Sequence, residues 1–324
     1  MNKLKYALAG LGLLGTTFAA NAQTELNIAH VLGETSSYEV ASRKLAELVA
    51  EKSGGELVIN VYNQGALGGE LKLTQGLRTG TVDLAFIATA SLENTVPELK
   101  LFSLPYLFDS HPQALEILGS DVGQELLGTL EPYNMIGLGW GAVYERSTPS
   151  IPAIKSVEDL EGTKIRVIQS PGYVATYEAF GAQATPLAYG ELFLALQNGI
   201  VDAAELAPDQ TIGDGFGQVI KNYTLTRVHQ LPSMLLASPA LKARLSDEEW
   251  AMIVEAAPEA LDAAIKAHAE ATAAGLEEMR KLGITVHEPD LAPFKEKARG
   301  SWETVIADIP NGQALVDSIE AAKK

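Results

Sequence analysis

The chain has 324 residues, of which 47% are hydrophobic, and its 41 acidic and 24 basic residues give a formal net charge of −17. Such an excess of negative charge argues against nucleic acid or an anionic lipid surface as a partner. The chain has no cysteine, which excludes disulfide bonds, thiol chemistry, thiolate metal sites and a lipid-modified cysteine. Stability must therefore come from the packed core.

The first 22 residues are predicted to be a signal peptide. Lys3 and Lys5 precede an apolar run over residues 6–20, and residues 20–22 (Ala-Asn-Ala) have the small-x-small pattern of a cleavage site. Cleavage after Ala22 would leave 302 residues (324 minus 22), enough for two cores, with a charge of −19 (22 minus 41). No later segment approaches about 18 consecutive apolar residues, so we expect a periplasmic protein without direct membrane insertion.

The next part of the chain has the rhythm of a parallel α/β layer. Residues 25–31 alternate like a strand, and residues 36–52 have the apolar spacing of an amphipathic helix, which Ser53-Gly54-Gly55 ends. Residues 56–62 and 82–87 predict two further strands, and residues 70–77 a second helix that ends near Gly80. The expected order is βαβαβ.

A second α/β lobe is predicted further along the chain. Residues 163–167, 183–185 and 200–204 have strand patterns, with helices over about 172–180 and 191–197. Crossovers between the lobes are expected near 141–144 and 226–232. Lobe I would comprise residues 23–143 plus about 232–271, and lobe II residues 144–231 plus about 272–324.

A long helix is predicted after the second lobe. Residues 246–249 (Ser-Asp-Glu-Glu) form a capping box, and an Ala-rich helical pattern continues to about Leu282. An unbroken helix of this length would extend about 50 Å at ~1.5 Å per residue, enough to bridge both lobes. A kink at Gly275 or a break near Pro258 is the alternative.

Few residues have the spacing of a cofactor, metal or catalytic motif. Residues 10–15 match Gly-x-Gly-x-x-Gly, but they lie inside the predicted signal peptide, and the five histidines have no metal-ligand spacing. No Gly-x-Ser-x-Gly motif is present. We therefore expect no cofactor, no metal and no enzymatic activity. A hydrolase or lyase that uses Glu70, Asp83 or Glu205 is the alternative, although the sequence shows no nucleophile to accompany them.

Two arginines are the candidate anion-binding residues. Arg166 lies between Ile165 and Val167 in a predicted buried strand, so its guanidinium should point from a strand end into a cleft that needs an anion. The alternative is an ion pair with a nearby carboxylate, Asp159 or Glu161. For Arg146, the local sequence favours a surface position as much as a binding position.

Four segments together resemble one protein family. Residues 101–108 (LFSLPYLF), 156–167 (SVEDLEGTKIRV), 181–187 (GAQATPL) and 195–202 (ALQNGIVD) resemble, in order and spacing, the DctP-type solute-binding subunit of TRAP (tripartite ATP-independent periplasmic) transporters. The resemblance covers nearly the whole chain after residue 22. It implies a periplasmic binding protein of two α/β lobes, with a hinge, a ligand cleft between the lobes and a long bridging helix. The implied partners are a small organic acid and the small and large membrane subunits of a permease.

The same resemblance implies roles for individual residues. Arg166 would bind the ligand carboxylate through two hydrogen bonds, for which the guanidinium fork is suited and the lysine ammonium is not. Arg146 would join the same carboxylate. Gln169 stands where relatives often supply a side-chain amide, and Tyr189 where they supply an aromatic wall.

Departures from the family pattern bear on the ligand. Many relatives have Asn-Pro after the residue that matches Glu205, whereas this chain has Leu206, which cannot donate a hydrogen bond. Ala88 and Ser91 replace a charged pair of sialic-acid-binding relatives, which weighs against sialate. The open ligand classes are a C4-dicarboxylate, a 2-oxo or 2-hydroxy acid, an aromatic acid and a sugar acid. A cation bridge near Glu205 is not expected, and a sensory receptor is the alternative to a transport protein.

Overall fold

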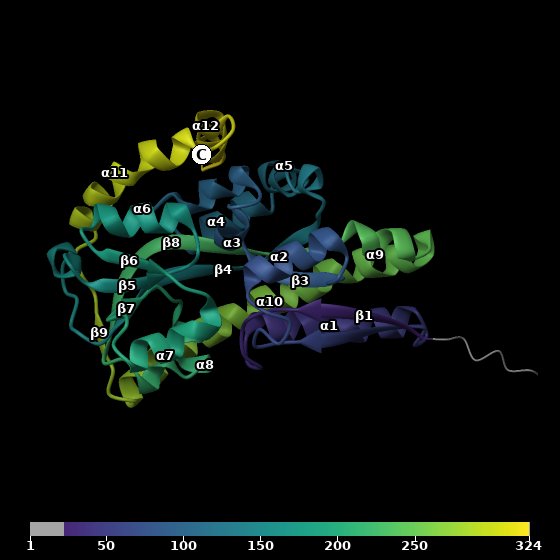
Figure 1. The fold of residues 1–324 in the computed structure, drawn as a ribbon, viewed down its shortest axis with the longest axis horizontal. Helices are drawn as coiled ribbons and strands as arrows, with labels where there is room; N and C mark the ends of the chain where they lie inside the picture. Colours follow the sequence, from purple (N-terminus) through teal and green to yellow (C-terminus); the bar gives the residue numbers. More distant parts are fainter. Residues whose placement is uncertain (1–22, 324) are drawn as a thin grey trace, which may run out of the picture.

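The fold is built on one continuous sheet. The computed structural model describes residues 23–323, so the predicted signal peptide lies outside the described residues. Within them, the strand order is β2-β1-β3-β8-β4-β7-β5-β6, with β9 paired to β8 (Figure 1). No helix of residues 23–323 is long and apolar enough to span a bilayer.

The first lobe is the predicted βαβαβ layer. Strands β1 (Thr24–Ala29), β2 (Leu57–Tyr62) and β3 (Leu84–Ala88) are parallel and alternate with helices α1 (Ser37–Lys52) and α2 (Glu70–Thr79). Ser36 starts α1, because its Oγ accepts a hydrogen bond from the Glu39 backbone N–H at 3.3 Å. Gly80, at φ 77°, ends α2. The prediction for this lobe is confirmed.

The second lobe repeats the pattern. Strand β5 (Lys164–Val167) pairs in parallel with β6 (Gln183–Pro186) and β7 (Ala203–Ala204), and helices α6 (Pro171–Ala179) and α7 (Leu192–Gln197) lie between them in the chain. Strand β7 is shorter than the predicted 200–204. The Ile200 backbone N–H donates to Ala195 at 2.9 Å and so belongs to the turn that ends α7.

Two long strands connect the lobes. Strands β4 (Ile136–Ser150) and β8 (Asn222–Ala237) pair antiparallel along their length, and β9 (Thr285–His287) joins the end of β8. The β4–β8 register shifts between Trp140 and Val143 and again between Arg146 and Thr148. Both predicted crossovers therefore fall within strands that extend from one lobe into the other.

Helix α10 (Asp247–Lys281) is a single helix of 35 residues. Ser246 Oγ accepts from the Glu249 backbone N–H at 3.1 Å, and the Glu249 carboxylate accepts from the Ser246 N–H at 2.8 Å, so the predicted capping box is confirmed. The alternative of a break at Pro258 is wrong. The helix packs against α1 and against α8 (Pro208–Gly213). At Gly275, a Cβ would lie 2.9 Å from the Pro208 carbonyl oxygen, which explains the glycine.

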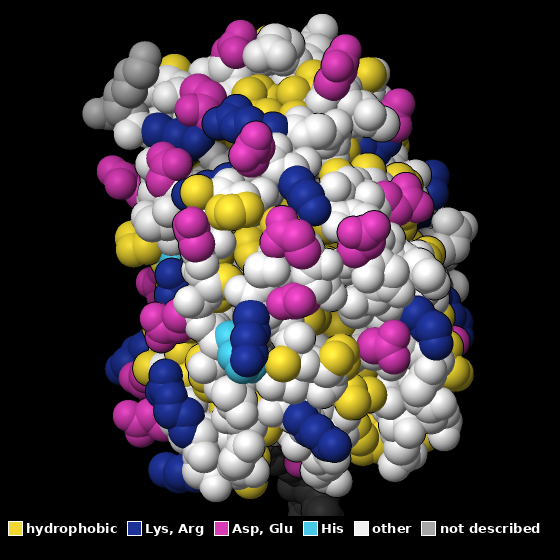
Figure 2. Space-filling model, turned by 90° about the vertical axis from the view of Figure 1, so that its left-hand side faces the viewer, with side chains coloured by type: hydrophobic (Ala, Val, Ile, Leu, Met, Phe, Trp, Pro, Cys, Tyr) yellow, Lys and Arg dark blue, Asp and Glu magenta, His cyan; other side chains and the backbone are white. Residues whose placement is uncertain are grey.

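The C-terminal helices pack on other helices. Helix α11 packs on α6, and α12 contacts η1 and α5. Acidic and basic side chains are interspersed over the face shown in Figure 2, so the negative charge is not gathered there in one patch. The elements not yet given are α3 (Thr89–Leu92), η1 (Pro97–Ser103), α4 (His111–Leu118), α5 (Asp121–Gly128), η2 (Glu131–Tyr133), η3 (Val157–Leu160), η4 (Tyr189–Glu191), η5 (Phe216–Gln218), α9 (Pro239–Arg244), α11 (Ala292–Ala307) and α12 (Gly312–Ala322).

Candidate functional site

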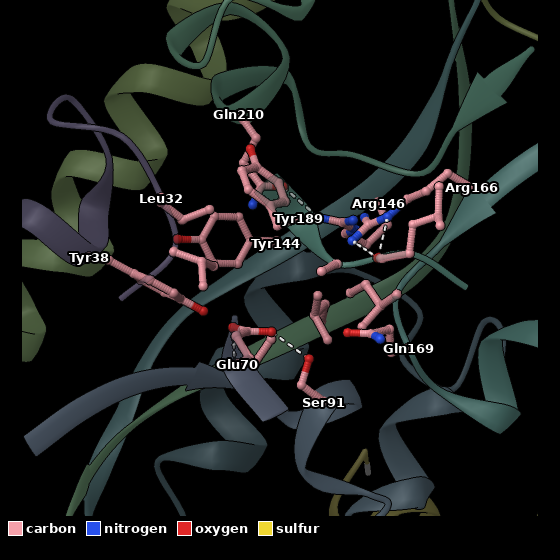
Figure 3. Close-up of a pocket in the computed structure, with 16 residues that line it drawn as sticks. Leu32, Tyr38, Glu70, Ser91, Tyr144, Arg146, Arg166, Gln169, Tyr189 and Gln210 are labelled. Carbon is pink, nitrogen blue, oxygen red and sulfur yellow. Dashed lines mark hydrogen bonds between the residues drawn. The ribbon is translucent and has the colours of Figure 1, made fainter. Parts of the chain in front are cut away.

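A cavity lies between the two lobes, beside the crossover strands (Figure 3). The first lobe contributes the chain after β1, the start of α1 and α2, and the β3–α3 junction. Strand β4, the end of β5 and the segment before η4 form the other side. The lining residues used below are Tyr38, Glu70, Ala88, Ser91, Arg146, Arg166, Leu187, Gln169, Tyr189 and Gln210.

Arg166 lies on β5 and is 2% exposed. Its Nε and Nη2 donate to the Leu187 carbonyl oxygen at 3.0 and 2.8 Å, while the buried Nη1 has no hydrogen-bond partner. Asp159 does not pair with it, because the Asp159 carboxylate accepts from the Lys155 and Ser156 backbone N–H groups instead. Burial and the charge of Arg146 lower the pKa of Arg166 to about 10, so the guanidinium is a cation at neutral pH.

Arg146 lies on β4, next to the register shift, and is only 1% exposed. The surface interpretation is therefore wrong. Its Nη1 donates to the Gln210 side-chain oxygen and its Nη2 to the Glu205 backbone carbonyl, while Nε has no partner. These contacts hold the guanidinium beside Arg166 (Figure 3).

The two guanidiniums form a positive end of the cavity. Among residues 23–323, neither Arg146 nor Arg166 forms an ion pair with a carboxylate. Burying two adjacent cations away from water is unfavourable in free energy unless an anion binds between them. The arrangement is therefore suited to bind an anion.

Glu70 forms the opposite wall. It is the first residue of α2, and its carboxylate accepts from the Ala88 backbone N–H at 2.9 Å and from the Ser91 hydroxyl. The Tyr38 hydroxyl lies on the same side (Figure 3). Burial raises the pKa of Glu70, and the hydrogen bonds from Ser91 and Ala88 partly oppose the shift. From the sequence, Glu70 is expected only as a candidate catalytic acid, although its place at the start of a helix that follows a strand is typical of a cleft residue.

Gln169 and Tyr189 line the cavity next to Arg166. Gln169 follows β5, and its backbone carbonyl accepts from the Asn94 side chain at 2.8 Å. The Tyr189 ring centroid lies 5.9 Å from the Arg166 guanidinium carbon, a cation–π distance. The Tyr189 hydroxyl donates to Asp214 Oδ2 at 2.5 Å.

Glu205 and Leu206 lie behind the cavity rather than along it. Leu206 is fully buried in a small apolar cluster with Leu192, Phe216 and Tyr223. The Glu205 carboxylate is 2.7 Å from His229 Nδ1, and both side chains are fully buried. Glu205 therefore reaches the cavity only through its backbone carbonyl, which accepts from Arg146.

The third acid of the catalytic alternative has a structural role. The Asp83 carboxylate accepts from the Asn27 backbone and side chain, each at 2.9 Å, and pairs with Arg244 at 2.9 Å. Within residues 23–323, no group of three or more His, Cys, Asp or Glu side chains is placed to hold a metal ion.

Known proteins are similar to most of the chain. Residues 28–308 match the model of the DctP family, described as bacterial extracellular solute-binding protein, family 7. A solute-binding protein of Verminephrobacter eiseniae is 32% identical over 268 residues, which cover 82% of this chain and 80% of the relative.

Two similar solved structures are a TRAP periplasmic solute-binding protein from Sulfitobacter sp. NAS-14.1 with bound β-D-galacturonate and a sugar acid binding protein from Advenella mimigardefordensis in complex with galactonate. Each has a TM-score of 0.89 and 27% identity; the first match covers 92% of this chain and 100% of the other, the second 93% and 99%. The two-lobed fold expected from the sequence is confirmed. The chain belongs to the DctP family, family 7 of the bacterial extracellular solute-binding proteins.

Proposed function

We propose that this protein captures one small organic acid anion between its lobes, in the periplasm, for uptake by a TRAP transporter. The observation that carries the proposal is the pair of buried guanidiniums, Arg166 and Arg146, that meet in the interlobe cavity with no carboxylate partner among residues 23–323. A ligand carboxylate supplies the missing negative charge.

The proposed carboxylate site uses the free edge of Arg166. Because Nε and one N–H of Nη2 are held by the Leu187 carbonyl, Nη1 and the second N–H of Nη2 remain to bind two carboxylate oxygens. Arg146 adds a second cation, Gln169 an amide and Tyr189 an aromatic wall. Glu205 and Leu206, proposed from the sequence as ligand-binding residues, would act indirectly: Glu205 positions Arg146, and Leu206 packs behind it.

The opposite wall narrows the class of ligand. Both Glu70 oxygens accept hydrogen bonds, as a carboxylate does, so a second carboxylate on the ligand would meet a like charge there, whereas a hydroxyl group could donate to Glu70. We therefore propose a hydroxylated monocarboxylic acid, of the sugar-acid type, over a C4-dicarboxylate. The galacturonate of the Sulfitobacter relative and the galactonate of the Advenella relative have this chemistry.

Release of the ligand unchanged is part of the proposal. Glu205, Asp83 and Glu70, the acids weighed as catalytic groups, each already accept hydrogen bonds from other side chains or the backbone. The binding site would require no cofactor and no bridging cation.

Transport would follow from closure of the lobes around the ligand. We propose that lobe I, residues 23–143 plus about 232–271, moves against lobe II, residues 144–231 plus about 272–324. Strands β4 and β8 and helix α10 connect the two lobes. Helix α12 of lobe II also contacts α5 and η1 of lobe I. The small and large membrane subunits of a permease would receive the closed form. Export would use the predicted signal peptide, cleaved after Ala22.

Thermal melting of residues 23–324 tests the proposal, after unfolding and refolding to remove any carried-over ligand. The panel contains galactonate, D-galacturonate, succinate, an aromatic acid and neutral galactose. A ligand at about 100 times its Kd adds about 2.7 kcal/mol of stability. Shifts with the hydroxy acids that vanish in Arg166→Ala support the proposal, and NMR of the recovered ligand tests its release unchanged. Shifts with galactose alone, or with acids regardless of Arg166, contradict it.

A further inference from the structure

We infer that Asp214 is a latch residue that couples closure of the lobes to the wall of the ligand site. This inference rests on the proposed function, because a latch matters only if the cleft opens and closes. It starts from one carboxylate that contacts both the opposite lobe and a residue of the proposed clamp.

The first contact crosses the mouth of the cleft. Asp214 follows α8, and its Oδ1 accepts a hydrogen bond from the Gly33 backbone N–H at 3.0 Å, although 181 residues separate them in the chain. Gly33 is buried in the segment between β1 and α1 of the first lobe. Both residues line a groove at the cleft mouth, with Gln64 on one side and Phe193 on the other. Opening of the cleft would break this hydrogen bond.

A side chain at position 33 would displace the Asp214 carboxylate. A Cβ on Gly33 would lie well inside van der Waals contact with Asp214 Oδ1. On the opposite segment, a Cβ on Gly213 would lie 3.0 Å from the Thr35 hydroxyl. The backbone of Gly33 therefore lies against the Asp214 side chain, and the backbone of Gly213 against the Thr35 side chain. The two segments can come this close because each has a glycine at the contact.

The second contact leads to the ligand site. The other carboxylate oxygen of Asp214 accepts from the Tyr189 hydroxyl at 2.5 Å. The Tyr189 ring in turn faces the Arg166 guanidinium at 5.9 Å. With one oxygen on Gly33 and the other on Tyr189, the Asp214 carboxylate that contacts the wall beside Arg166 is itself held by the first lobe when the lobes are together. It is a positioning residue and contacts no part of the proposed ligand.

A latch of this kind predicts a specific pattern of affinities. Loss of a hydrogen bond to a charged group corresponds to about 10- to 150-fold weaker binding, mostly through faster dissociation, because the contact exists only in the closed state. Gly33→Ala and Asp214→Ala should each produce this loss. The double variant should be no weaker than Asp214→Ala alone, since the carboxylate that the new methyl group strikes is gone.

The experiment combines titration with an interlobe distance. D-galacturonate is the probe, and binding is measured by calorimetry and stopped-flow fluorescence. Since the chain has no cysteine, one cysteine can be introduced in each lobe, at Tyr62 and at Leu194, and each can carry a spin label. The native side chains at these two positions are 38% and 58% exposed. The matched control is Gly69→Ala, whose Cβ would lie at an ordinary 3.7 Å from Ala188 across the cleft. Circular dichroism checks that every variant is folded.

The expected result is weaker binding, faster dissociation and a depleted short-distance population in Gly33→Ala and Asp214→Ala, with Gly69→Ala unchanged and the double variant non-additive. Additive effects, or equal effects of Gly33→Ala and Gly69→Ala, overturn the latch. If the parent does not bind D-galacturonate, the proposed ligand class fails, and the latch is judged on the distances alone. In that case, loss of the short interlobe distance in Gly33→Ala but not in Gly69→Ala supports the latch. A parent protein that never shows the short interlobe distance refutes the latch.

Discussion

Replacement of Arg166 by lysine tests the clamp most directly. The guanidinium serves two acceptors at once, since Nε and Nη2 hold the Leu187 carbonyl and Nη1 remains for the ligand. A lysine ammonium that reaches the ligand must leave the Leu187 carbonyl, and one that stays on the carbonyl cannot present a fork. In both cases at least one charge-assisted hydrogen bond is lost, which makes the binding free energy less favourable by about 1.5–3 kcal/mol. Arg166→Lys should therefore bind roughly 10- to 150-fold more weakly.

The assay is isothermal titration with whichever acid of the melting panel binds the parent best. Arg43→Lys is the matched control, because Arg43 is 67% exposed, does not line the cavity, and lysine keeps the positive charge that contacts the buried Glu39 carboxylate. Arg166→Ala should lose more, about 2–5 kcal/mol, since it leaves the ligand carboxylate buried without that partner. A folded Arg166→Lys protein whose Kd lies within twofold of the parent's would refute the two-pronged clamp.

Three further predictions concern neighbouring carboxylates. Glu70→Gln should improve succinate binding by roughly 10-fold, by removing a like charge. It should also raise the melting temperature of the ligand-free protein more at pH 7 than at pH 4. Burial raises the pKa of Glu70 in the folded protein above its ordinary value, so stability is lost as the pH rises from the ordinary value toward the raised one, whereas at pH 4 the carboxyl group is mostly protonated in both states. An equal gain at both pH values would contradict this. Tyr189→Phe should weaken acid binding roughly 10-fold, because one oxygen of Asp214 loses its donor, and unchanged affinity in titration would exclude that role. Arg244→Ala should lower the free energy of unfolding in urea by about 1.5–3 kcal/mol by unpairing Asp83, but leave the Kd unchanged; an altered Kd would bring Asp83 back as a functional acid.

Local signals predicted most of the elements. The βαβαβ order of the first lobe, the repeat in the second and the capped long helix all follow from periodicity and caps that lie within a few residues of one another. Pro258 was the ambiguous case, since proline usually ends a helix. In the structure, α10 continues through it, because the packing of its apolar face on α1 and α8 outweighs one missing hydrogen bond.

The site was harder to predict. The local sequence of Arg146 suits a surface position as much as a binding position, and its burial becomes visible only when β4 pairs with β8 inside the fold. Glu70 carries no motif that distinguishes it from the 40 other acids, and it becomes a cavity wall only because α2 starts opposite Arg166. Leu206 was expected near the ligand, yet it lies behind the cavity in an apolar cluster with Leu192 and Phe216, a contact between separate segments that no local pattern shows.

The sequence alone determined the α/β class, the long helix and the family, because propensity, periodicity and ordered segments are properties of the chain itself. It also marked Arg166, because an arginine between two apolar strand residues needs a special environment. Only the tertiary structure decided that Arg146 joins Arg166, that Glu70 faces them and that Asp214 contacts Gly33 from 181 residues away. These placements depend on strand register and on how closely two lobes approach, and neither is encoded in any short stretch of residues.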